Sequence, residues 1–352
     1  MGPPDVIGVG IVGYGLAGRL FHAPYIDVVD GLRIAAIATS NRDRQAQATA
    51  EHPDAKILGS VDELLEAPDV EVVVVVTPNR SHVPVGIRAL QAGRHVVVDK
   101  PIAMNLPEAE LLIDAADRAG RILSVYQNRR WDGDFLTVRS LLDADALGPI
   151  DSLEARFERW SPVGTEWREL ADEAGGPHRD LGAHLVDQSL VLFGPARRVF
   201  AQMDRRRPDS QVEDSTFVAI DHASGVRSRL WTSLIAARPG PRFRIRGVGG
   251  EYVKDHLDPQ ELQLLDGLRP ADPGFGRESP EADGRLYGRD GSVRVIPTER
   301  GGYEHFYERF RDAVRGEGER PVDPVDAVRG LCVLEAAERS ARTGAVEIVA
   351  EA

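Results

Sequence analysis

The chain has 352 residues, of which 42% are hydrophobic and 28% are charged, and its formal net charge is -13. A chain of this length is expected to form about two domains, with ample apolar material for their cores. An acidic surface repels phosphate backbones and anionic lipids, so we expect neither a nucleic-acid partner nor a membrane partner.

Cysteine usage and the N-terminus bear on the cellular compartment. Cys332 is the only cysteine, which excludes an intrachain disulfide and fits a reducing compartment. It lies in a small and apolar stretch, Gly330–Ala337, where we expect it to pack in a core. Met1–Asp5 lacks the positively charged segment of an export signal, and the apolar stretch Val6–Val12 is far too short to span a membrane. We therefore expect a cytoplasmic protein.

The first 127 residues alternate between two kinds of segment. Short β-branched runs, which suit strands buried on both faces of a parallel sheet, alternate with stretches of helical periodicity. Such alternation gives crossover connections, so we expect an N-terminal α/β domain with a doubly wound parallel sheet, the Rossmann fold. The predicted strands are Val6–Val12, Leu32–Thr39, Val70–Thr77, Val96–Asp99 and Ile122–Gln127, and the predicted helices are Ala17–Val28, Asp43–Glu51, Ser60–Glu66, Ser81–Ala92 and Pro107–Ala119.

After residue 125 the pattern changes to longer alternating segments, some of them apolar on both faces. We therefore expect a C-terminal α+β domain with a large, mostly antiparallel sheet, and we place the two domains at residues 1–125 and 126–352. Residues 266–291 are rich in Gly, Pro, Asp and Arg without a period, and we expect them to be irregular. The predicted strands are Ile150–Trp160, Arg197–Asp204, Ser215–Asp221, Val226–Leu234, Arg242–Gly247 and Ser292–Pro297, and the predicted helices are Asp180–Phe193 and Pro324–Arg342.

A glycine-rich motif, Gly13-Tyr14-Gly15-Leu16-Ala17-Gly18, follows a predicted strand and opens a predicted helix. In this context Gly13 permits a tight turn, Gly15 lets a pyrophosphate approach the backbone, and Gly18 allows the helix to pack closely on the strand. The helix N-terminus supplies unpaired N–H groups to the phosphates. We therefore expect residues 13–18 to bind a dinucleotide.

The end of the second predicted strand bears on the choice of cofactor. A site for NAD usually places an Asp or Glu there for the ribose hydroxyls, but this chain has no acid before Asp43. Ser40 and Asn41 can donate hydrogen bonds, and Arg42 can stack on adenine and pair with a 2′-phosphate. The segment favours NADP over NAD. The alternative is that Arg42 simply faces solvent at a helix start.

Further motifs carry a family resemblance. They are Phe21-His22-Ala23-Pro24, Thr77-Pro78-Asn79-Arg80-Ser81-His82, Asp99-Lys100-Pro101 and Asp180-Leu181-Gly182-Ala183-His184-Leu185-Val186-Asp187. With the glycine motif they resemble the glucose–fructose oxidoreductase / inositol dehydrogenase family, Gfo/Idh/MocA, over essentially the whole chain. The family usually has Glu before Lys-Pro, where this chain has the shorter Asp99. Ser124-Val125-Tyr126-Gln127-Asn128-Arg129-Arg130-Trp131-Asp132-Gly133-Asp134-Phe135 resembles the NADP-dependent scyllo-inositol dehydrogenase branch.

The resemblance implies an NAD(P)-dependent dehydrogenase or reductase that acts on CH–OH groups. Its substrate would be a small polyhydroxylated molecule, namely a polyol, a cyclitol such as scyllo-inositol, or a sugar. The first domain would bind the cofactor, and the second would bind the substrate and form a homodimer or homotetramer through its sheet. An open sheet of this size often buries one face against another subunit.

Lys100 falls at the carboxyl end of a predicted strand, where the cofactor crevice of such a sheet lies. Its ammonium can donate a hydrogen bond to a substrate hydroxyl and lower the pKa of that hydroxyl. The alternative is a strand-end lysine that faces water. The resemblance further implies that the Lys100–Pro101 peptide is cis.

Asp180 and His184 are four residues apart, so on a helix they share a face. From spacing alone, such a pair is more often a surface contact. The resemblance implies that His184 is the general acid or base and that Asp180 binds or orients a substrate hydroxyl. Lys100 and His184 would then converge over one nicotinamide ring, and the division of the acid–base role between them stays open.

The other candidate residues follow from the same motifs. His22 and His82 are expected to shape loops rather than to react, and Trp160, Trp167 and Arg168 are candidates for a lid or pocket. The remaining histidines show no metal-ligand spacing, so we predict no metal. The cofactor is expected to contact residues 13–18, Ser40, Asn41, Arg42, Thr77, Pro78, Asn79, His82, Asp99, Lys100 and Asn128. The substrate is expected to contact Lys100, Asn128, Arg130, Asp180 and His184.

Two other functions are compatible with the fold. The chain can be a regulator that binds a dinucleotide without catalysis, although the combination of Lys100, Asp180 and His184 argues against a pure sensor. It can also be a glycosidase of the same family that uses a tightly held NAD, although Ser40-Asn41-Arg42 does not suit the free ribose hydroxyls of NAD.

Overall fold

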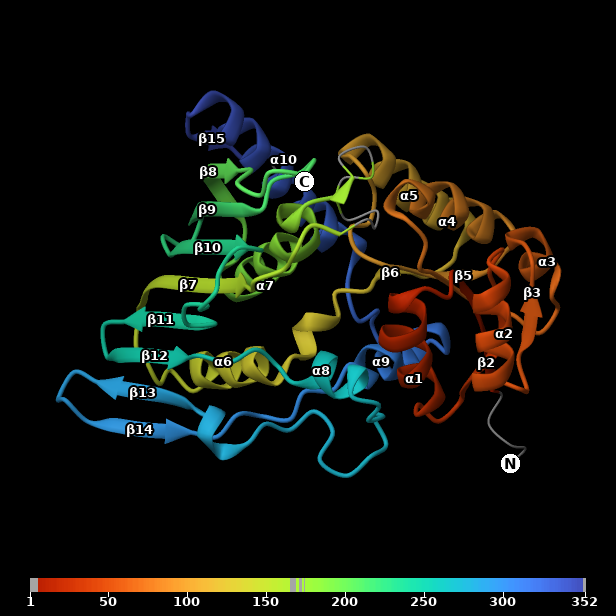
Figure 1. Ribbon diagram of the computed structural model, residues 1–352, viewed down its shortest axis with the longest axis horizontal. Coiled ribbons are helices and arrows are strands. Elements are labelled where there is room, and N and C mark those ends of the chain that lie inside the picture. The colour runs from red at the N-terminus through yellow and green to blue at the C-terminus, as the bar shows by residue number, and fades with distance from the viewer. Residues whose placement is uncertain (1–5, 165–168, 171–172, 174, 351–352) are drawn as a thin grey trace. The chain divides into compact units, whose positions relative to one another are not determined.

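The computed structural model describes residues 6–164, 169–170, 173 and 175–350 (Figure 1). The chain divides into two compact units, and neither is continuous in sequence. The first unit consists of Met1–Asn128, Glu261–Phe275 and Gly302–Pro324, and the second of Arg129–Gln260, Gly276–Gly301 and Val325–Ala352. In the described part of the chain, no helix is long and apolar enough to cross a membrane.

The first unit is built on a six-stranded sheet with the order β3-β2-β1-β4-β5-β6, in which every pair of neighbours is parallel. The order turns back at β1, so β1 and β4 flank the position where a doubly wound sheet opens a crevice. The residues of β1 and β4 are buried throughout, as expected for strands covered on both faces. The predicted Rossmann fold is confirmed. The strands are β1 (Ile7–Val12), β2 (Leu32–Ala38), β3 (Lys56–Leu58), β4 (Val72–Val75), β5 (His95–Val98) and β6 (Leu123–Val125).

Side-chain caps begin three helices of this unit. Asn41, Ser60 and Asn105 each accept a hydrogen bond from the backbone N–H three residues later. The helices are α1 (Ala23–Asp27), α2 (Arg42–Glu51), α3 (Val61–Glu66), α4 (His82–Gln91), α5 (Leu106–Ala119), most of α8 (Gln260–Leu265) and α9 (Glu304–Val314). The prediction of one α-helix over Ala17–Val28 was wrong in detail, because Gly18–His22 forms a π-helical turn before α1.

The second unit contains a nine-stranded sheet with the order β14-β13-β12-β11-β7-β10-β9-β8-β15. Its β7–β10 pair is parallel and the other pairs are antiparallel, which confirms the predicted large, mostly antiparallel sheet. The strands are β7 (Ile150–Glu158), β8 (Ala196–Asp204), β9 (Ser215–His222), β10 (Arg227–Ser233), β11 (Phe243–Gly247), β12 (Gly250–Lys254), β13 (Gly284–Gly288), β14 (Val293–Ile296) and β15 (Glu347–Ile348).

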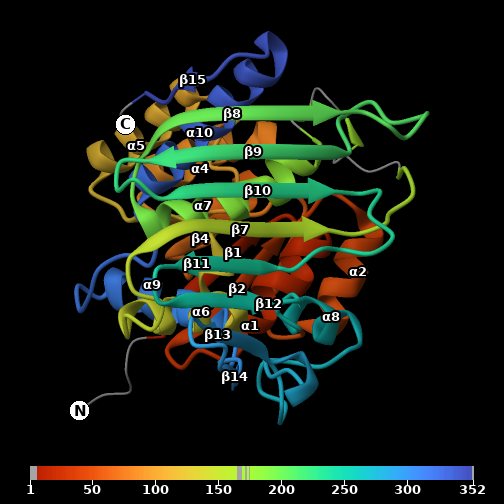
Figure 2. The ribbon, with the colours of Figure 1, turned by 90° about the vertical axis from the view of Figure 1, so that its left-hand side faces the viewer.

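Helices of the second unit lie along one face of this sheet (Figure 2). They are α6 (Gly133–Asp143), α7 (Ala183–Phe193) and α10 (Pro324–Thr343). The predicted helix Asp180–Phe193 differs from the observed one, since His178–Gly182 is a π-helical turn and α7 begins at Ala183. A π-helical turn within a helical segment often marks a functional site.

The prediction that residues 266–291 are wholly irregular was wrong. Gly284–Gly288 forms β13, which pairs with β12 and β14. Its burial alternates along only five residues, with Leu286 buried and Tyr287 exposed. A glycine at each end leaves an alternating pattern too short to recognise in the sequence, although it pairs well in the sheet.

A buried charge network lies between the sheet and helices of the second unit. Arg242 is 1% exposed, and its Nε donates to Asp134 Oδ2 at 3.0 Å. Its Nη2 donates to Gln188 Oε1 on α7 at 2.8 Å, and its guanidinium lies 4.2 Å from the ring centroid of Phe243. Asp134 is fully buried, so its charge is tolerated only with this partner.

Replacement of Arg242 by Leu should therefore strongly destabilise the folded protein. The change leaves the Asp134 carboxylate buried without its cation, which costs about 3–5 kcal/mol of unfolding free energy. The matched control is Arg246→Leu on β11, whose ion pair with Glu251 is about half exposed and contributes about 0–1 kcal/mol. Urea unfolding of both variants measures the difference, and equal losses would contradict this reading of the network.

Candidate functional site

The glycine motif connects β1 to the π-helical turn at the carboxyl edge of the parallel sheet. Gly13 has φ +101°, and a Cβ on it would lie 2.2 Å from the carbonyl oxygen of Val76. A Cβ on Gly18 would lie 2.2 Å from the carbonyl oxygen of Gly13. At Gly15 the nearest atom is a guanidinium nitrogen of Arg44, 3.6 Å away. The fold therefore requires Gly13 and Gly18, whereas Gly15 leaves an open backbone beside a cation.

The side chains around this motif also determine whether a dinucleotide fits there. Tyr14 is buried, and its hydroxyl donates to Glu51 Oε2 at 2.7 Å. Burial, with the Glu51 carboxylate, raises the pKa of the Tyr14 phenol well above its ordinary value. Leu16 is exposed. The hydroxyl oxygen of Thr77 is buried without a hydrogen-bond partner among the described residues. An open glycine and an unused hydroxyl at one sheet edge fit a dinucleotide.

The turn after β2 exposes two arginines, Arg42 and Arg44, with Asp43 between them. The Asn41 side chain accepts the Arg44 N–H at 3.0 Å and so serves as the cap of α2. Ser40, Arg42 and Arg44 are exposed. Arg44, which the sequence analysis missed, lies beside Gly15. The sequence signal for Arg44 was its position three residues after Asn41, because an N-cap asparagine places that residue in the first turn of the helix.

His82 connects two strand ends of the first unit. Its Nδ1 lies 2.8 Å from the carbonyl oxygen of Pro101 and its Nε2 lies 2.9 Å from that of Thr77. The ring is buried. Burial lowers the pKa of His82, although the Asp99 carboxylate and the two carbonyl acceptors oppose that shift. These contacts join the Thr-Pro-Asn and Lys-Pro motifs, so they support the predicted role of His82 in shaping loops.

The carboxylate of Asp99 anchors the backbone at Lys100. Asp99 Oδ1 accepts the Lys100 N–H at 2.8 Å, and Oδ2 lies 3.8 Å from His22 Nε2. Burial alone would raise the pKa of Asp99, but His22, Lys100 and His82 together hold it below its ordinary value. The Lys100–Pro101 peptide is cis, as the resemblance implied. His22 is buried, and its Nδ1 contacts the hydroxyl of Tyr307 on α9.

The second unit holds the other predicted acid–base residues. His184 is buried in the first turn of α7, and Asp180 lies in the preceding π-helical turn. Asp180 lines a hollow of about 410 Å³, together with Arg159, Ser161 and Glu169. A partly polar hollow of this size can take a small polyhydroxylated molecule. The structure thus places Lys100 in the first unit, and Asp180 and His184 in the second.

Two residues of the Asn128–Trp131 turn were expected to reach the ligands. Asn128, the last residue of the N-terminal segment of the first unit, is 8% exposed. Arg130, in the second unit, binds the carboxylates of Asp187 and Asp326. The sequence analysis quoted Asp187 without giving it a role. The sequence signal for such a role was the position of Asp187, a charged residue among the apolar residues of a predicted helix.

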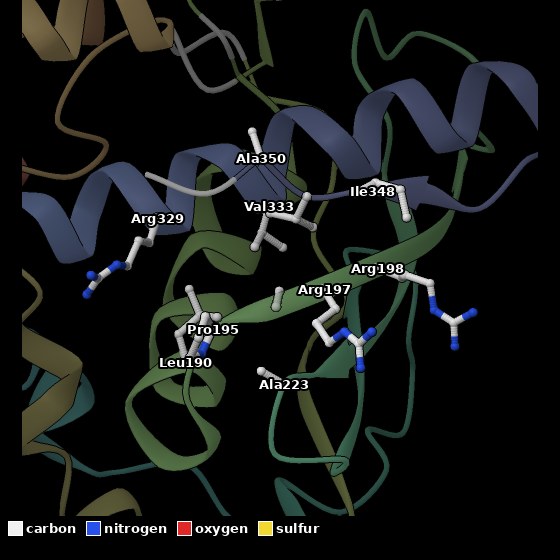
Figure 3. A pocket seen from close by; sticks show the side chains of 11 residues that line it. Leu190, Pro195, Arg197, Arg198, Ala223, Arg329, Val333, Ile348 and Ala350 are labelled. Atoms are coloured by element: carbon white, nitrogen blue, oxygen red, sulfur yellow. The ribbon is translucent and has the colours of Figure 1, made fainter.

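A second hollow, the candidate lid residues and the search for a metal site complete the description. A hollow of about 480 Å³ in the second unit is lined by residues of α7, α10, β8 and β15, and none of its lining residues was predicted to be in the site (Figure 3). Trp160 is exposed, and Trp167 and Arg168 lie outside the described residues. In the described ranges, no three or more His, Cys, Asp or Glu gather to hold a metal ion.

Comparison with known proteins gives matches over both halves of the chain. A family model described as an oxidoreductase family with an NAD-binding Rossmann fold matches residues 7–127, and a GFO/IDH/MocA C-terminal domain model matches residues 135–253. A scyllo-inositol 2-dehydrogenase (NADP(+)) of Bacillus subtilis is 35% identical over 342 residues, which cover 96% of this chain and 94% of that one. An uncharacterized oxidoreductase of Escherichia coli is 37% identical over 342 residues, which cover 96% and 97%. The solved structure of a Bacillus subtilis oxidoreductase superimposes with a TM-score of 0.94 at 34% identity and covers 99% of each chain.

The glycine motif allows a test that separates folding from binding. Gly15→Ala should leave the melting temperature unchanged, because a Cβ fits there in ordinary contact, but it should occupy the space of the approaching phosphates. We expect the dinucleotide dissociation constant to rise about tenfold or more, which corresponds to about 1.4 kcal/mol. Gly18→Ala should lower the melting temperature instead, because its Cβ meets a backbone oxygen. Calorimetry and fluorescence titration measure both, and unchanged affinity in Gly15→Ala would refute the assignment.

Proposed function

Because the chain belongs to the Gfo/Idh/MocA family of oxidoreductases, we propose that it transfers a hydride between a nicotinamide dinucleotide and a secondary alcohol or ketone carbon of a polyol, cyclitol or sugar. The predicted family and the predicted enzyme class, a dehydrogenase or reductase acting on CH–OH groups, are confirmed by the comparisons. The observation that carries the finer proposal is Lys100, anchored by Asp99 at the same sheet edge as the glycine motif.

In the proposed reaction, oxidation of a carbinol removes a hydride from carbon and a proton from oxygen. The nicotinamide, when bound, supplies the hydride acceptor. The Lys100 ammonium donates a hydrogen bond to the reacting hydroxyl and stabilises the negative charge that develops on its oxygen. His184 takes the hydroxyl proton, and Asp180 accepts a hydrogen bond from a neighbouring hydroxyl and so orients the substrate. The hollow beside Asp180 supports a small hydroxylated substrate.

We propose scyllo-inositol or a related cyclitol as the first substrate to test, since the Bacillus subtilis relative is named a scyllo-inositol 2-dehydrogenase. For the cofactor we propose NADP. The turn after β2 offers the exposed Arg42 and Arg44, and the same relative is named for NADP(+). Arginine suits a 2′-phosphate because its planar guanidinium binds phosphate oxygens at two points.

The assembly and location of the protein are part of the proposal. Phe217 and Trp231 lie side by side on neighbouring strands, with ring centroids 5.2 Å apart, and Arg156 covers the Trp231 ring at 4.0 Å. These half-buried aromatic side chains support a homodimer or homotetramer that forms through the sheet. The buried Cys332 is in keeping with a cytoplasmic location.

A spectrophotometric assay tests the function as a whole. The protein is incubated with NADP or NAD and a panel of inositols, polyols and sugars. Steady NADPH formation with one cyclitol or polyol is the expected result. Tight dinucleotide binding without turnover would replace the proposal with a regulator, and glycoside cleavage without net change of the cofactor would replace it with a glycosidase.

Lys100→Ala tests the proposed charge at the strand end. The variant should keep its dinucleotide affinity and lose about 10²–10³-fold in kcat, the usual contribution of one donor to a developing oxyanion. Lys56→Ala serves as the control, since Lys56 is an exposed lysine on β3 that pairs with Asp69. Initial-rate kinetics and fluorescence titration give both quantities. If Lys100→Ala turned over at the wild-type rate, the lysine would have no part in the mechanism.

Cofactor choice is tested at the turn after β2. Arg42→Ala and Arg44→Ala should each raise the NADP dissociation constant about tenfold or more, because a charge-assisted contact to the 2′-phosphate is lost. The NAD dissociation constant should change little. Arg33→Ala, at the amino end of the same strand, is the control and should affect neither cofactor. Equal losses for NAD and NADP would contradict a phosphate contact.

A further inference from the structure

We propose that Arg130 is a positioning residue rather than a substrate ligand: it fixes α7 through Asp187, and α7 carries His184 one turn earlier. The role of His184 rests on the proposed function, but the contacts that hold α7 do not. Arg130 lies in the Asn128–Trp131 turn, 57 residues before Asp187, so the contact joins distant parts of the second unit.

The contact between Arg130 and Asp187 is a two-point ion pair. Arg130 Nε donates to Asp187 Oδ2 at 2.8 Å, and Nη2 donates to Oδ1 at 2.7 Å. The two side chains are 12% and 5% exposed. A fork-to-fork pair of this kind fixes the relative orientation of its partners as well as their distance. The ion pair therefore specifies the rotation of α7 about its axis.

A second carboxylate completes the set of partners around the guanidinium. Asp326 on α10 accepts from both Nη1 and Nη2 of Arg130 at 3.2 Å. Burial alone would lower the pKa of Arg130, but Asp187 and Asp326 raise it further above its ordinary value, so the guanidinium remains charged. Its Nε and both terminal nitrogens already have carboxylate acceptors. A substrate hydroxyl would have to displace a charged acceptor in order to bind here.

The neighbouring residues form a parallel contact. Gln188, the residue after Asp187, donates from Nε2 to the carbonyl oxygen of Arg129, the residue before Arg130, at 2.9 Å. Gln188 Oε1 accepts from the buried Arg242 at 2.8 Å. Two consecutive residues of α7 are thus held by two consecutive residues of the turn. We call these four residues, Arg129, Arg130, Asp187 and Gln188, the α7 clasp.

The clasp acts together with contacts that hold the segment before α7. No side-chain hydrogen bond caps the N-terminus of α7, since the residue at the cap position is Gly182. The π-helical turn before it is held by side chains: the His178 N–H donates to Glu213 Oε1 at 3.0 Å, and Arg179 pairs with Glu338 at 2.6 Å. Because α7 continues directly from this turn, the helical segment is held before His184 by the turn and after His184 by the clasp. The clasp thus sets the rotation of α7 after His184, and this rotation helps to direct the His184 side chain.

The experiment uses Arg130→Met, Asp187→Leu and the double variant in the full chain. Arg130→Met leaves the buried Asp187 without its cation, and Asp187→Leu leaves the guanidinium of Arg130 with Asp326 alone, so each single change is destabilising. Replacement of a whole buried ion pair by apolar residues is often neutral, and in the double variant the partly exposed Asp326 keeps its pair with Arg329. Arg198→Lys, in an exposed ion pair on β8, is the control. Each protein is examined by thermal unfolding, dinucleotide titration, steady-state kinetics and amide hydrogen exchange without ligand.

If the clasp positions His184, each single variant lowers kcat by about 10- to 100-fold, the effect of a small misplacement of a catalytic group. The KM for the cyclitol and the dinucleotide dissociation constant stay within about twofold. A twofold change in a dissociation constant corresponds to less than about 0.5 kcal/mol of binding free energy. Exchange at the amides of the first turn of α7 accelerates in the singles relative to Arg198→Lys. The double variant recovers thermal stability, exchange protection and part of kcat.

If Arg130 instead binds the substrate, Arg130→Met raises KM, Asp187→Leu does not, and the double variant is no better than Arg130→Met. That result would overturn the positioning role. The exchange measurement needs no substrate, so it tests the clasp separately from the proposed function. Accelerated exchange in the singles with no turnover of any polyol by the wild type would keep the clasp and remove the proposed function. Exchange in the singles equal to that of the control would remove the clasp.

Discussion

The first unit depends on one constraint, the parallel order of β1, β4 and β5. Because parallel strands present their carboxyl ends at the same edge, the glycine motif, Thr77 and Lys100 occupy one edge of the sheet although up to 87 residues of sequence separate them. The backbone at that edge is then fixed by polar contacts. Asp99 holds the Lys100 N–H, and His82 joins the carbonyl groups of Thr77 and Pro101. Strand order sets the location of Lys100, and these bonds fix the backbone around it.

The second unit has a different constraint, the placement of α7 on its sheet. Its sheet supplies an apolar surface, but apolar packing alone permits a helix to slide or rotate. Charged groups removed from water must be paired, and they are satisfied in few geometries, so they can specify one arrangement. Arg130 and Arg242 meet Asp187 and Gln188 on α7 in this way. The acid–base residues of the proposed reaction therefore lie on elements that polar contacts orient.

Much of the fold could be predicted from periodicity, and the failures have physical causes. Buried valine runs such as Val72–Val75 reveal parallel strands, but Lys56–Leu58 has only three residues and shows no pattern. Glu304–Val314 packs Phe306 and Tyr307 against Tyr126 of the first unit, a long-range contact that no local signal reports. At the candidate site the motifs located Gly15, Lys100 and His184. They did not reveal Arg44 beside Gly15 or the carboxylates around Arg130, because these pairings are made by tertiary contacts.

Our central proposal is that Lys100 and His184 act on the same substrate hydroxyl, and the most direct test is a double-mutant cycle on kcat/KM with Lys100→Met, His184→Asn and the combined variant. Residues that act as a unit are strongly non-additive, so the account predicts that the combined variant loses about as much activity as the worse single variant. Losses that multiply would show that the two side chains act independently, and wild-type activity in either single variant would contradict the account outright.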